Sequence, residues 1–264
     1  MTTRAYSTSF SLGIRCLDKS FRDPIYAIYG FVRFADEIVD TFHEHNKAGL
    51  LQGFAEDTWK AIDEQISLNP ILHSFQKVVR RYQIDHELIR QFLRSMEMDL
   101  KQKTYDQSGY QTYVLGSAEV VGLMCLRVFC KGDEAEYQRL KGDAMKLGSA
   151  FQKINFLRDL NADFAGLGRT YFPGVDLTRF DDDAKRKIEL EIAADFRSGF
   201  RGIRQLPKGV RLGVYVAYLY YLALFKKIQQ LPSSAVLESR IRVRNRHKLA
   251  ILGYSFVKHQ LNLI

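Results

Sequence analysis

The sequence has few of the residues that define disulfide scaffolds, zinc modules or proline-rich folds. Only three cysteines, five prolines and one tryptophan occur in 264 residues. Cys16, Cys125 and Cys130 form neither a CxxC pair nor a zinc-ligand spacing, and three cysteines cannot close a disulfide framework. We therefore expect a protein of a reducing, cytoplasmic compartment.

Long apolar runs are also absent from the sequence. The longest, GVYVAYLYYLALF at 213–225, has 13 residues, whereas a transmembrane helix needs about 20. The N-terminal stretch MTTRAYSTSF lacks the apolar core of a secretory signal peptide. These absences predict a soluble or peripheral protein.

Positive charge and aromatic residues are plentiful. Lys and Arg number 39 against 30 Asp and Glu, which gives a net charge of +9. A basic balance favours anionic partners, such as nucleic acid, phosphorylated small molecules or an anionic membrane. The 18 phenylalanines and 14 tyrosines fill a core or line a large apolar cavity, and composition does not decide between the two.

Helical periodicity dominates the chain, because apolar residues recur at three- and four-residue steps in long segments without internal breaks. It predicts an all-α protein of nine or ten helices, and no Pro/Gly/Ser-rich linker divides the chain, so we expect one domain, 1–264. The single strand candidate is SRIRVRNRHK at 239–248, where arginines alternate. The expected helices cover 23–43, 46–67, 69–82, 86–101, 110–129, 135–164, 182–205, 209–230 and 246–262.

Two of these helices carry aspartates four residues apart, in ADEIVD at 35–40 and RDLNAD at 158–163. Residues at i and i+4 are neighbours on one helix face, about 6 Å apart, and like charges there repel unless something neutralises them. A solvated acidic stripe is the alternative for either pair alone. The first pair, however, follows a largely apolar and aromatic stretch, which favours the end of a buried helix.

The second pair continues a polar row on one helix face, formed by Gln152, Asn155, Asp159 and Asp163. Carboxylate and amide oxygens suit a hard cation, and Mg²⁺ typically takes one or two carboxylates together with substrate phosphates. A neighbouring guanidinium, such as that of Arg158, matches phosphate oxygens. The pattern therefore predicts a site for a magnesium diphosphate.

Several segments, in this order and spacing, resemble the squalene/phytoene synthase family of head-to-head prenyl transferases, and most strongly its bacterial phytoene synthase branch. The matching stretches are STSF at 7–10, YGFVRFADEIVD at 29–40, MEMDL at 96–100, YVLGSAEVVGLM at 113–124, FQKINFLRDLNAD at 151–163, GRTYFP at 168–173, YLALFKKI at 221–228 and SRIRV at 239–243.

The resemblance implies an isoprenoid synthase helical bundle around a central cavity, with the two acidic helices facing each other across its mouth. It implies a catalytic tyrosine near the reacting carbons, Tyr113, acting with the four aspartates. The implied metal ligands are Asp36, Asp40, Asn155, Asp159 and Asp163. The implied diphosphate contacts are Ser7, Ser9, Arg33, Arg158, Arg169, Tyr221, Arg240 and Lys248. The implied cavity residues are Phe10, Tyr29, Val121 and Gln152.

The activity that the resemblance implies is a head-to-head condensation of two geranylgeranyl diphosphates, through a cyclopropyl (prephytoene) diphosphate, to phytoene. Mg²⁺ is the expected cofactor, with Mn²⁺ as a substitute, and NADPH is not expected. The alternative is a squalene or dehydrosqualene synthase that uses two farnesyl diphosphates. We expect a monomer with prenyl diphosphates as partners, loose contact with a membrane and no nucleic acid. A helical module that binds RNA or membrane through its charge is the non-enzymatic alternative, and it gives no reason for two acid pairs.

The sequence departs from the family pattern at two acidic positions. Glu37 replaces a common aspartate and keeps its charge. Glu119 stands where a small residue is usual, so either the middle of the cavity is altered or this side chain points outward. The basic segment 240–248 also has three interpretations: a solvated segment, a lid over diphosphate, or a contact with nucleic acid or membrane.

Overall fold

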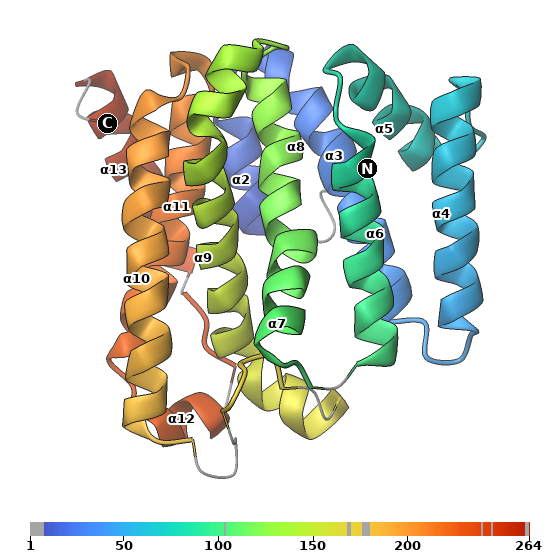
Figure 1. Cartoon of the computed structure of the whole chain (residues 1–264). Helices are drawn as coiled ribbons and strands as arrows, with labels where there is room; N and C mark the ends of the chain where they lie inside the picture. Colours follow the sequence, from blue (N-terminus) through green and yellow to red (C-terminus); the bar gives the residue numbers. More distant parts are fainter. Residues whose placement is uncertain are drawn as a thin grey trace.

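The chain folds almost entirely into helices, as a computed structural model shows (Figure 1). The structure describes residues 8–102, 104–167, 170–175, 180–238, 240–243, 245–261 and 264, without the side chains of 8–10, 162–167 and 245–246. Within these ranges no strand occurs, and the single β-type pairing is an isolated bridge between Thr104 and Thr170. The all-α prediction is confirmed.

The helices, in chain order, are α2 (Thr8–Arg15), α3 (Lys19–Asp40), α4 (Lys47–Glu64), α5 (Pro70–Arg81), α6 (His86–Lys101), α7 (Gln107–Val114), the π-helical turn η1 (Leu115–Glu119), α8 (Val120–Phe129), α9 (Glu134–Leu167), α10 (Asp182–Gln205), α11 (Lys208–Gln229), α12 (Ser233–Glu238) and α13 (Asn245–Gln260).

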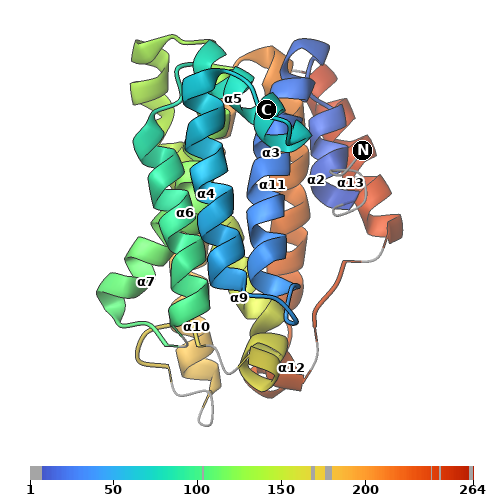
Figure 2. The ribbon, with the colours of Figure 1, turned by 90° about the vertical axis from the view of Figure 1, so that its right-hand side faces the viewer.

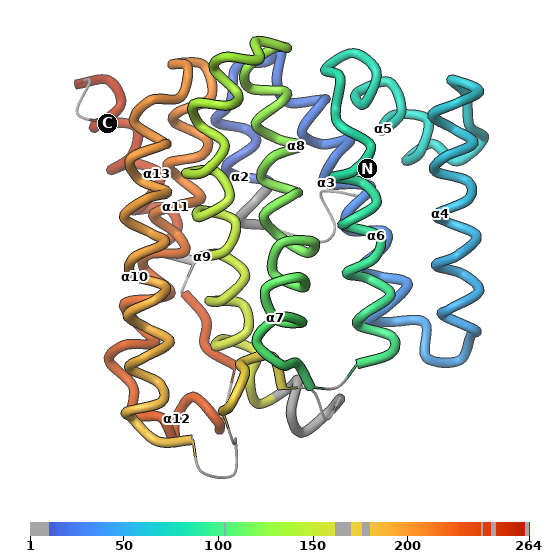
Figure 3. Tube along the Cα trace, in the orientation of Figure 1, coloured from blue at the N-terminus to red at the C-terminus, as the bar shows by residue number. Residues whose placement is uncertain are grey.

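The long helices run up and down beside one another (Figures 1 and 3). The continuous helix formed by α7, η1 and α8 lies in the middle: it packs against α6 and α3 on one side and against α9 on the other. Beyond α9 follow α10 and α11, and α13 lies at the outer edge against α11 (Figure 2). One core cluster joins α3–α6 with α8, and a second joins α9–α11 with α7.

Side-chain caps fix where several helices begin. The carboxylate or amide oxygens of Asn46, Asn69, Asp85, Asp106 and Asp181 each accept a hydrogen bond from a backbone N–H in the first turn of the helix that follows. Such caps satisfy amide groups that have no partner within the helix. The sequence therefore sets these boundaries locally, and the expected helices 86–101 and 182–205 agree with α6 and α10.

Two short helices and one irregular segment differ from the expectations. Helices α2 and α12 have eight and six residues, which is too short for periodicity to reveal them. The strand candidate at 239–248 is wrong: residues 240–243 have no regular structure, and α13 begins at Asn245. The alternation there arises because Ile241 and Val243 are buried while Arg240 and Arg242 are exposed.

The continuous helix Gln107–Phe129 is, among the described helices, the one that is long and apolar enough to cross a membrane. Polar residues interrupt it, so it contains no long apolar run. A core helix passes the same test of length and composition, and Val120, Met124 and Val128 are fully buried in the bundle. Its central place in the packing accounts for its composition.

Glycine allows α9 to approach this central helix closely. A Cβ atom at Gly148 would lie 2.8 Å from the Ala118 carbonyl oxygen and 3.1 Å from the Cα of Glu119. Both are backbone atoms, so the contact has no flexible side chain that could yield. The close approach places the start of α8 beside the face of α9 that carries Gln152 and Asn155.

We expect Gly148→Ala to lower the free energy of unfolding by about 1–3 kcal/mol, because the new methyl group overlaps backbone. Gly142→Ala on the same helix is the matched control, since no atom lies within 4 Å of its Cβ position. Alanine is the better helix former there, so the control should gain up to about 1 kcal/mol. Urea unfolding of both variants checks this, and equal effects would contradict the close packing.

Candidate functional site

A cavity of about 870 Å³ runs between α3, α8, α9 and α11. Each helix turns one face toward it: the lining residues recur at helical steps, as Ile25, Tyr29, Val32 and Asp36 do on α3. The wall is completed by residues 240–243 and Lys248. Four helix faces from distant parts of the sequence thus form one enclosure.

The lining is mostly apolar toward one end and polar toward the other. Leu140 and Asn155 both line the cavity on α9, and 15 residues of helix span about 22 Å, so the cavity is elongated. The apolar end includes Leu126, Phe129, Leu140, Ile203 and Leu206. The polar end includes Arg33, Asp36, Gln152, Asn155, Arg158, Arg240 and Lys248.

On α3 the acids outnumber the cation that pairs with them. Arg33 donates to Glu37 at 2.8 Å and lies 3.8 Å from Asp36. Burial, together with the neighbouring carboxylate of Asp40, raises the pKa of Asp36 to about 7. Arg33 opposes this shift without cancelling it. At Asp36, burial and like charge therefore outweigh the compensation that Arg33 supplies.

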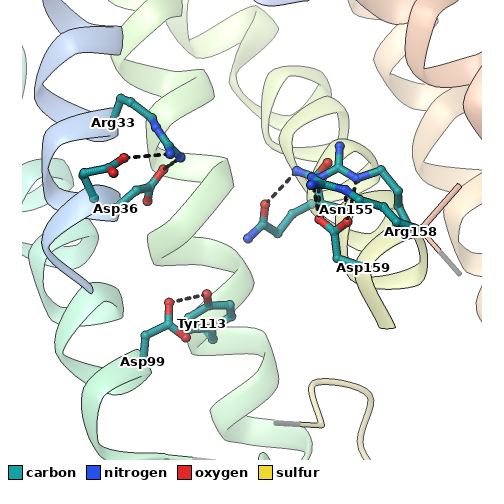
Figure 4. Close-up of polar contacts among 10 residues, drawn as sticks. Arg33, Asp36, Asp99, Tyr113, Asn155, Arg158 and Asp159 are labelled. Carbon is teal, nitrogen blue, oxygen red and sulfur yellow. Dashed lines mark hydrogen bonds and ion pairs between the residues drawn. The ribbon is translucent and has the colours of Figure 1, made fainter. Parts of the chain in front are cut away.

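On α9, the second acidic helix, cations outnumber the carboxylate that they contact. The Asp159 carboxylate accepts hydrogen bonds from Arg158 at 3.0 and 2.5 Å. Arg240, which lies 81 residues further along the chain, places its Nε 2.8 Å from the same carboxylate. Figure 4 shows this group on one side and Arg33 with Asp36 on the other. Asp159 is thus held between two guanidinium groups.

A row of hydrogen bonds joins the polar faces of three helices. The Tyr221 hydroxyl on α11 donates to Asn155 Oδ1 at 3.2 Å, Asn155 Nδ2 donates to Gln152 at 3.4 Å, and Gln152 donates to Ser117 at 3.3 Å. Phe151 stacks on the Tyr221 ring with centroids 4.1 Å apart. These contacts fix the amide oxygens that face the cavity.

Tyr113 lies close to the first acid pair but is not part of the cavity lining. Its hydroxyl donates to Asp99 Oδ2 at 2.6 Å, and both residues are buried. Burial, and next the charge of Asp99, raises the pKa of Tyr113 well above its usual value. The Tyr113 ring packs against Tyr105, Phe156 and Tyr171. Asp99 also raises the pKa of Asp36, which places the pair beside the acids of α3.

Asp99 is a residue of the site that sequence reasoning did not single out. The signal was available, because Asp99 follows Leu88, Phe92 and Ser95 on the buried face of α6 at steps of four, three and four residues. A carboxylate on a buried face needs a hydrogen-bond or charge partner. Such a position could have been recognised as part of a polar site.

Most of the expected site residues lie around this cavity. Those that line it are Tyr29, Arg33, Asp36, Val121, Gln152, Asn155, Arg158, Tyr221, Arg240 and Lys248. Asp40 and Asp159 interact with lining residues without being part of the lining. Tyr113 is not part of the lining and is held by Asp99. Ser7 and Arg169 lie outside the described residues, and the side chains of Ser9, Phe10 and Asp163 are not described.

Glu119, which stands where a small residue is usual in the family pattern, does not enter the cavity. Glu119 hydrogen-bonds with Ser149 on α9 and is absent from the cavity lining, whereas its neighbours Ala118 and Val121 belong to it. Burial raises the pKa of the Glu119 carboxyl, which the hydrogen bond from Ser149 opposes. Of the two expectations for this residue, the structure supports the one in which it points away from the cavity.

The sequence model of the family described as squalene/phytoene synthase matches residues 3–247. The chain belongs to this family. It is therefore an enzyme of the prenyltransferase type, and the resemblance found in its segments is confirmed.

Individual relatives cover most of the chain at low identity. It is 29% identical to the 15-cis-phytoene synthase of Synechococcus elongatus, over 86% of this chain and 82% of that protein. It is 34% identical to the presqualene diphosphate synthase of Sinorhizobium fredii, over 66% of this chain and 61% of that protein. The crystal structure of a dehydrosqualene synthase superposes with a TM-score of 0.83 and 21% identity, covering 98% of this chain and 94% of that one. The last likeness supports the fold alone.

Asp36→Asn should stabilise the protein in a chelating buffer. The folded-state pKa of Asp36 is raised from 3.8 to about 7, so folding binds a proton, and stability is lost as pH rises from about 4 to 7. Above about pH 7 the whole stability contribution of the protonated Asp36 carboxyl is lost. With allowance for screening of a side chain that is 34% exposed, we expect a melting temperature about 2–4 °C above wild type at about pH 8.

The gain should shrink toward about pH 4, where the carboxyl is protonated in folded protein and partly protonated in unfolded protein. Asp57→Asn, at an exposed position on α4, is the control and should change little at either pH. A gain at Asp36 that does not vary with pH would contradict the buried-charge explanation.

Proposed function

We propose that this enzyme is a phytoene synthase, which joins two geranylgeranyl diphosphates head to head through a cyclopropyl diphosphate. The observation that carries the proposal is the elongated cavity, which has an arginine- and carboxylate-bearing end and a mostly apolar remainder. Such a shape suits a diphosphate with a long hydrocarbon tail. The relatives named phytoene synthase support the same product class.

The cations of the polar end would bind the diphosphates. Arg33, Arg158 and Lys248 all line the cavity, and guanidinium groups pair with phosphate oxygens in a bidentate manner. Arg158 already pairs with Asp159, so a substrate diphosphate would compete for that guanidinium. We infer that binding redistributes these ion pairs while Tyr221 continues to hold Asn155 in place.

The acids and amides of the polar end fit Mg²⁺ by their chemistry. Asp36, Asp40, Asn155 and Asp159 offer hard oxygen ligands, and the raised pKa of Asp36 marks a deficit of positive charge. No group of three or more His, Cys, Asp or Glu side chains that could hold a metal occurs among the described residues, and Asp163 would add a further carboxylate. When bound, the metal would neutralise charge on the departing diphosphate.

The remaining residues would protect and orient the reacting carbons. Closure around an apolar cavity excludes water from a carbocation, and tyrosine rings stabilise nearby positive charge. Tyr29 and Tyr221 line the cavity. Tyr113 is held by Asp99 behind the wall, so we assign Asp99 a positioning role toward this tyrosine.

The activity test offers the purified protein geranylgeranyl or farnesyl diphosphate with Mg²⁺, with and without NADPH, and identifies the hydrocarbon by mass. We expect a C40 triene from geranylgeranyl diphosphate in the absence of NADPH. A C30 hydrocarbon as the main product would instead assign the enzyme to the squalene or dehydrosqualene synthases, and the cavity would then accept shorter chains.

Substitution of Asp36 and Asp159 tests whether these acids belong to the active site of that reaction. We expect Asp36→Asn and Asp159→Asn each to reduce Mg²⁺-dependent release of diphosphate by about 10²–10³-fold, as loss of charge stabilisation typically does. Asp183→Asn, an exposed acid at the start of α10, is the control and should keep full turnover. Unchanged turnover in both cavity variants would refute the assignment of the site.

A further inference from the structure

Helix α13 carries an apolar face that no other part of the described chain covers. Nine large apolar side chains are exposed among the described residues, and five of them lie at 249–261. They are Leu249, Tyr254, Phe256, Val257 and Leu261, with exposed fractions of 51–67%. A single exposed leucine is ordinary, but a contiguous apolar patch marks an interaction surface.

The helix geometry gathers these side chains on one side. At 100° per residue, they fall with the exposed Ala250 and Gly253 on one arc of α13. By the same geometry Gln260 falls within this arc at the C-terminal end of the helix, and Arg246 falls within it in the first turn. Ser255 faces the opposite way, is fully buried and donates to the Ile251 carbonyl at 2.7 Å. The inner side packs against α11, so the apolar arc points away from the bundle.

The α13 face is fixed in this orientation at both ends. Arg211 at the start of α11 donates to the Ile264 carbonyl at 3.0 Å. At the other end, Lys248 lies over the Tyr220 ring at 5.2 Å. Figure 2 shows α13 at the margin of the molecule. The apolar face is therefore presented to the outside of the molecule.

The charge around this face identifies its partner. After Glu238 the sequence contains six Lys and Arg and no Asp or Glu. Two of the six, Arg240 and Lys248, line the cavity, and the other four are at 242, 244, 246 and 258. His247 and Lys258 border one edge of the apolar arc by helical position. A second copy of the chain would bring like charges together. Nucleic acid would require a surface composed mainly of cations, whereas the exposed large side chains of this one are mostly apolar or aromatic.

We propose that α13 docks this protein on the surface of an anionic lipid bilayer, with Leu249, Tyr254, Phe256, Val257 and Leu261 inserted at the level of the headgroups. Helices of this kind combine apolar insertion with attraction between basic residues and anionic lipids. The segment before the helix, 240–243, lines the cavity. Docking would therefore bring the cavity wall close to the bilayer, although it does not depend on the proposed reaction.

The test is sedimentation of the purified protein with vesicles of phosphatidylcholine alone or with about 30% phosphatidylglycerol. We expect binding to the anionic vesicles at about 50 mM salt, and weaker binding at about 500 mM salt, because salt screens the attraction. The double variant Leu249→Gln/Phe256→Gln should bind about tenfold less tightly. The matched control is Leu68→Gln/Leu190→Gln, at two large apolar side chains that are exposed elsewhere, and it should bind like wild type.

Circular dichroism and thermal melting of both double variants establish that they are folded. The proposal is overturned if the wild-type protein does not sediment with anionic vesicles, or if the folded α13 variant binds them as tightly as wild type. Sedimentation velocity supplies a further outcome: a dimer that the α13 substitutions dissociate would assign the face to self-association. None of these readouts requires turnover, so their failure and failure of the proposed reaction are distinguishable.

Discussion

Carboxylates at one end of an otherwise apolar cavity must be neutralised, and this requirement organises the polar residues of the structure. On α9, Asp159 is neutralised within the chain by Arg158 and Arg240. On α3, Arg33 pairs mainly with Glu37, and burial together with the charge of Asp40 raises the pKa of Asp36 to about 7. The two sides of the cavity thus differ: two guanidinium groups pair with Asp159, whereas Arg33 only partly offsets burial and like charge at Asp36.

This difference gives the two acidic motifs different expected responses to ligands. A divalent cation would gain most at Asp36, where it replaces a proton held by burial and by repulsion from Asp40. At Asp159 a cation would have to displace or share two guanidinium groups, which a diphosphate could then take up. Metal and diphosphate binding would therefore be coupled through the arginines. A diphosphate that takes up the guanidinium groups would free the Asp159 carboxylate for the metal, and a metal bound at Asp159 would free the guanidinium groups for the diphosphate.

The helices could be predicted from the sequence because their signals are local. Apolar periodicity and capping residues such as Asn69 and Asp85 lie within the segments that they define. The acid pairs were visible for the same reason, since i and i+4 are neighbours on any helix. The short helices α2 and α12 and the irregular segment 240–243 depend on packing against the bundle, which local patterns do not encode.

Partners across the site could not be predicted, because they join residues far apart in the chain. The contact of Arg240 with Asp159 spans 81 residues, and nothing in the alternation of arginines at 240–246 distinguishes this one. The basic segment lies in two different surroundings. Arg240 lines the polar end of the cavity and pairs with Asp159, while Lys258 borders the apolar face of α13 by helical position.

The central helix shows how tightly the site depends on packing elsewhere. Its π-helical turn lies at η1, where Gly116 meets the Gln91 carbonyl of α6 and Ala118 meets Gly148 of α9. A π-helical turn inserts a residue and shifts the helix faces that follow, so Ser117, Val121 and Cys125 line the cavity while Glu119 turns to Ser149. A charged residue is therefore tolerated in the middle of this wall, because the backbone places it on the side facing α9 rather than in the cavity.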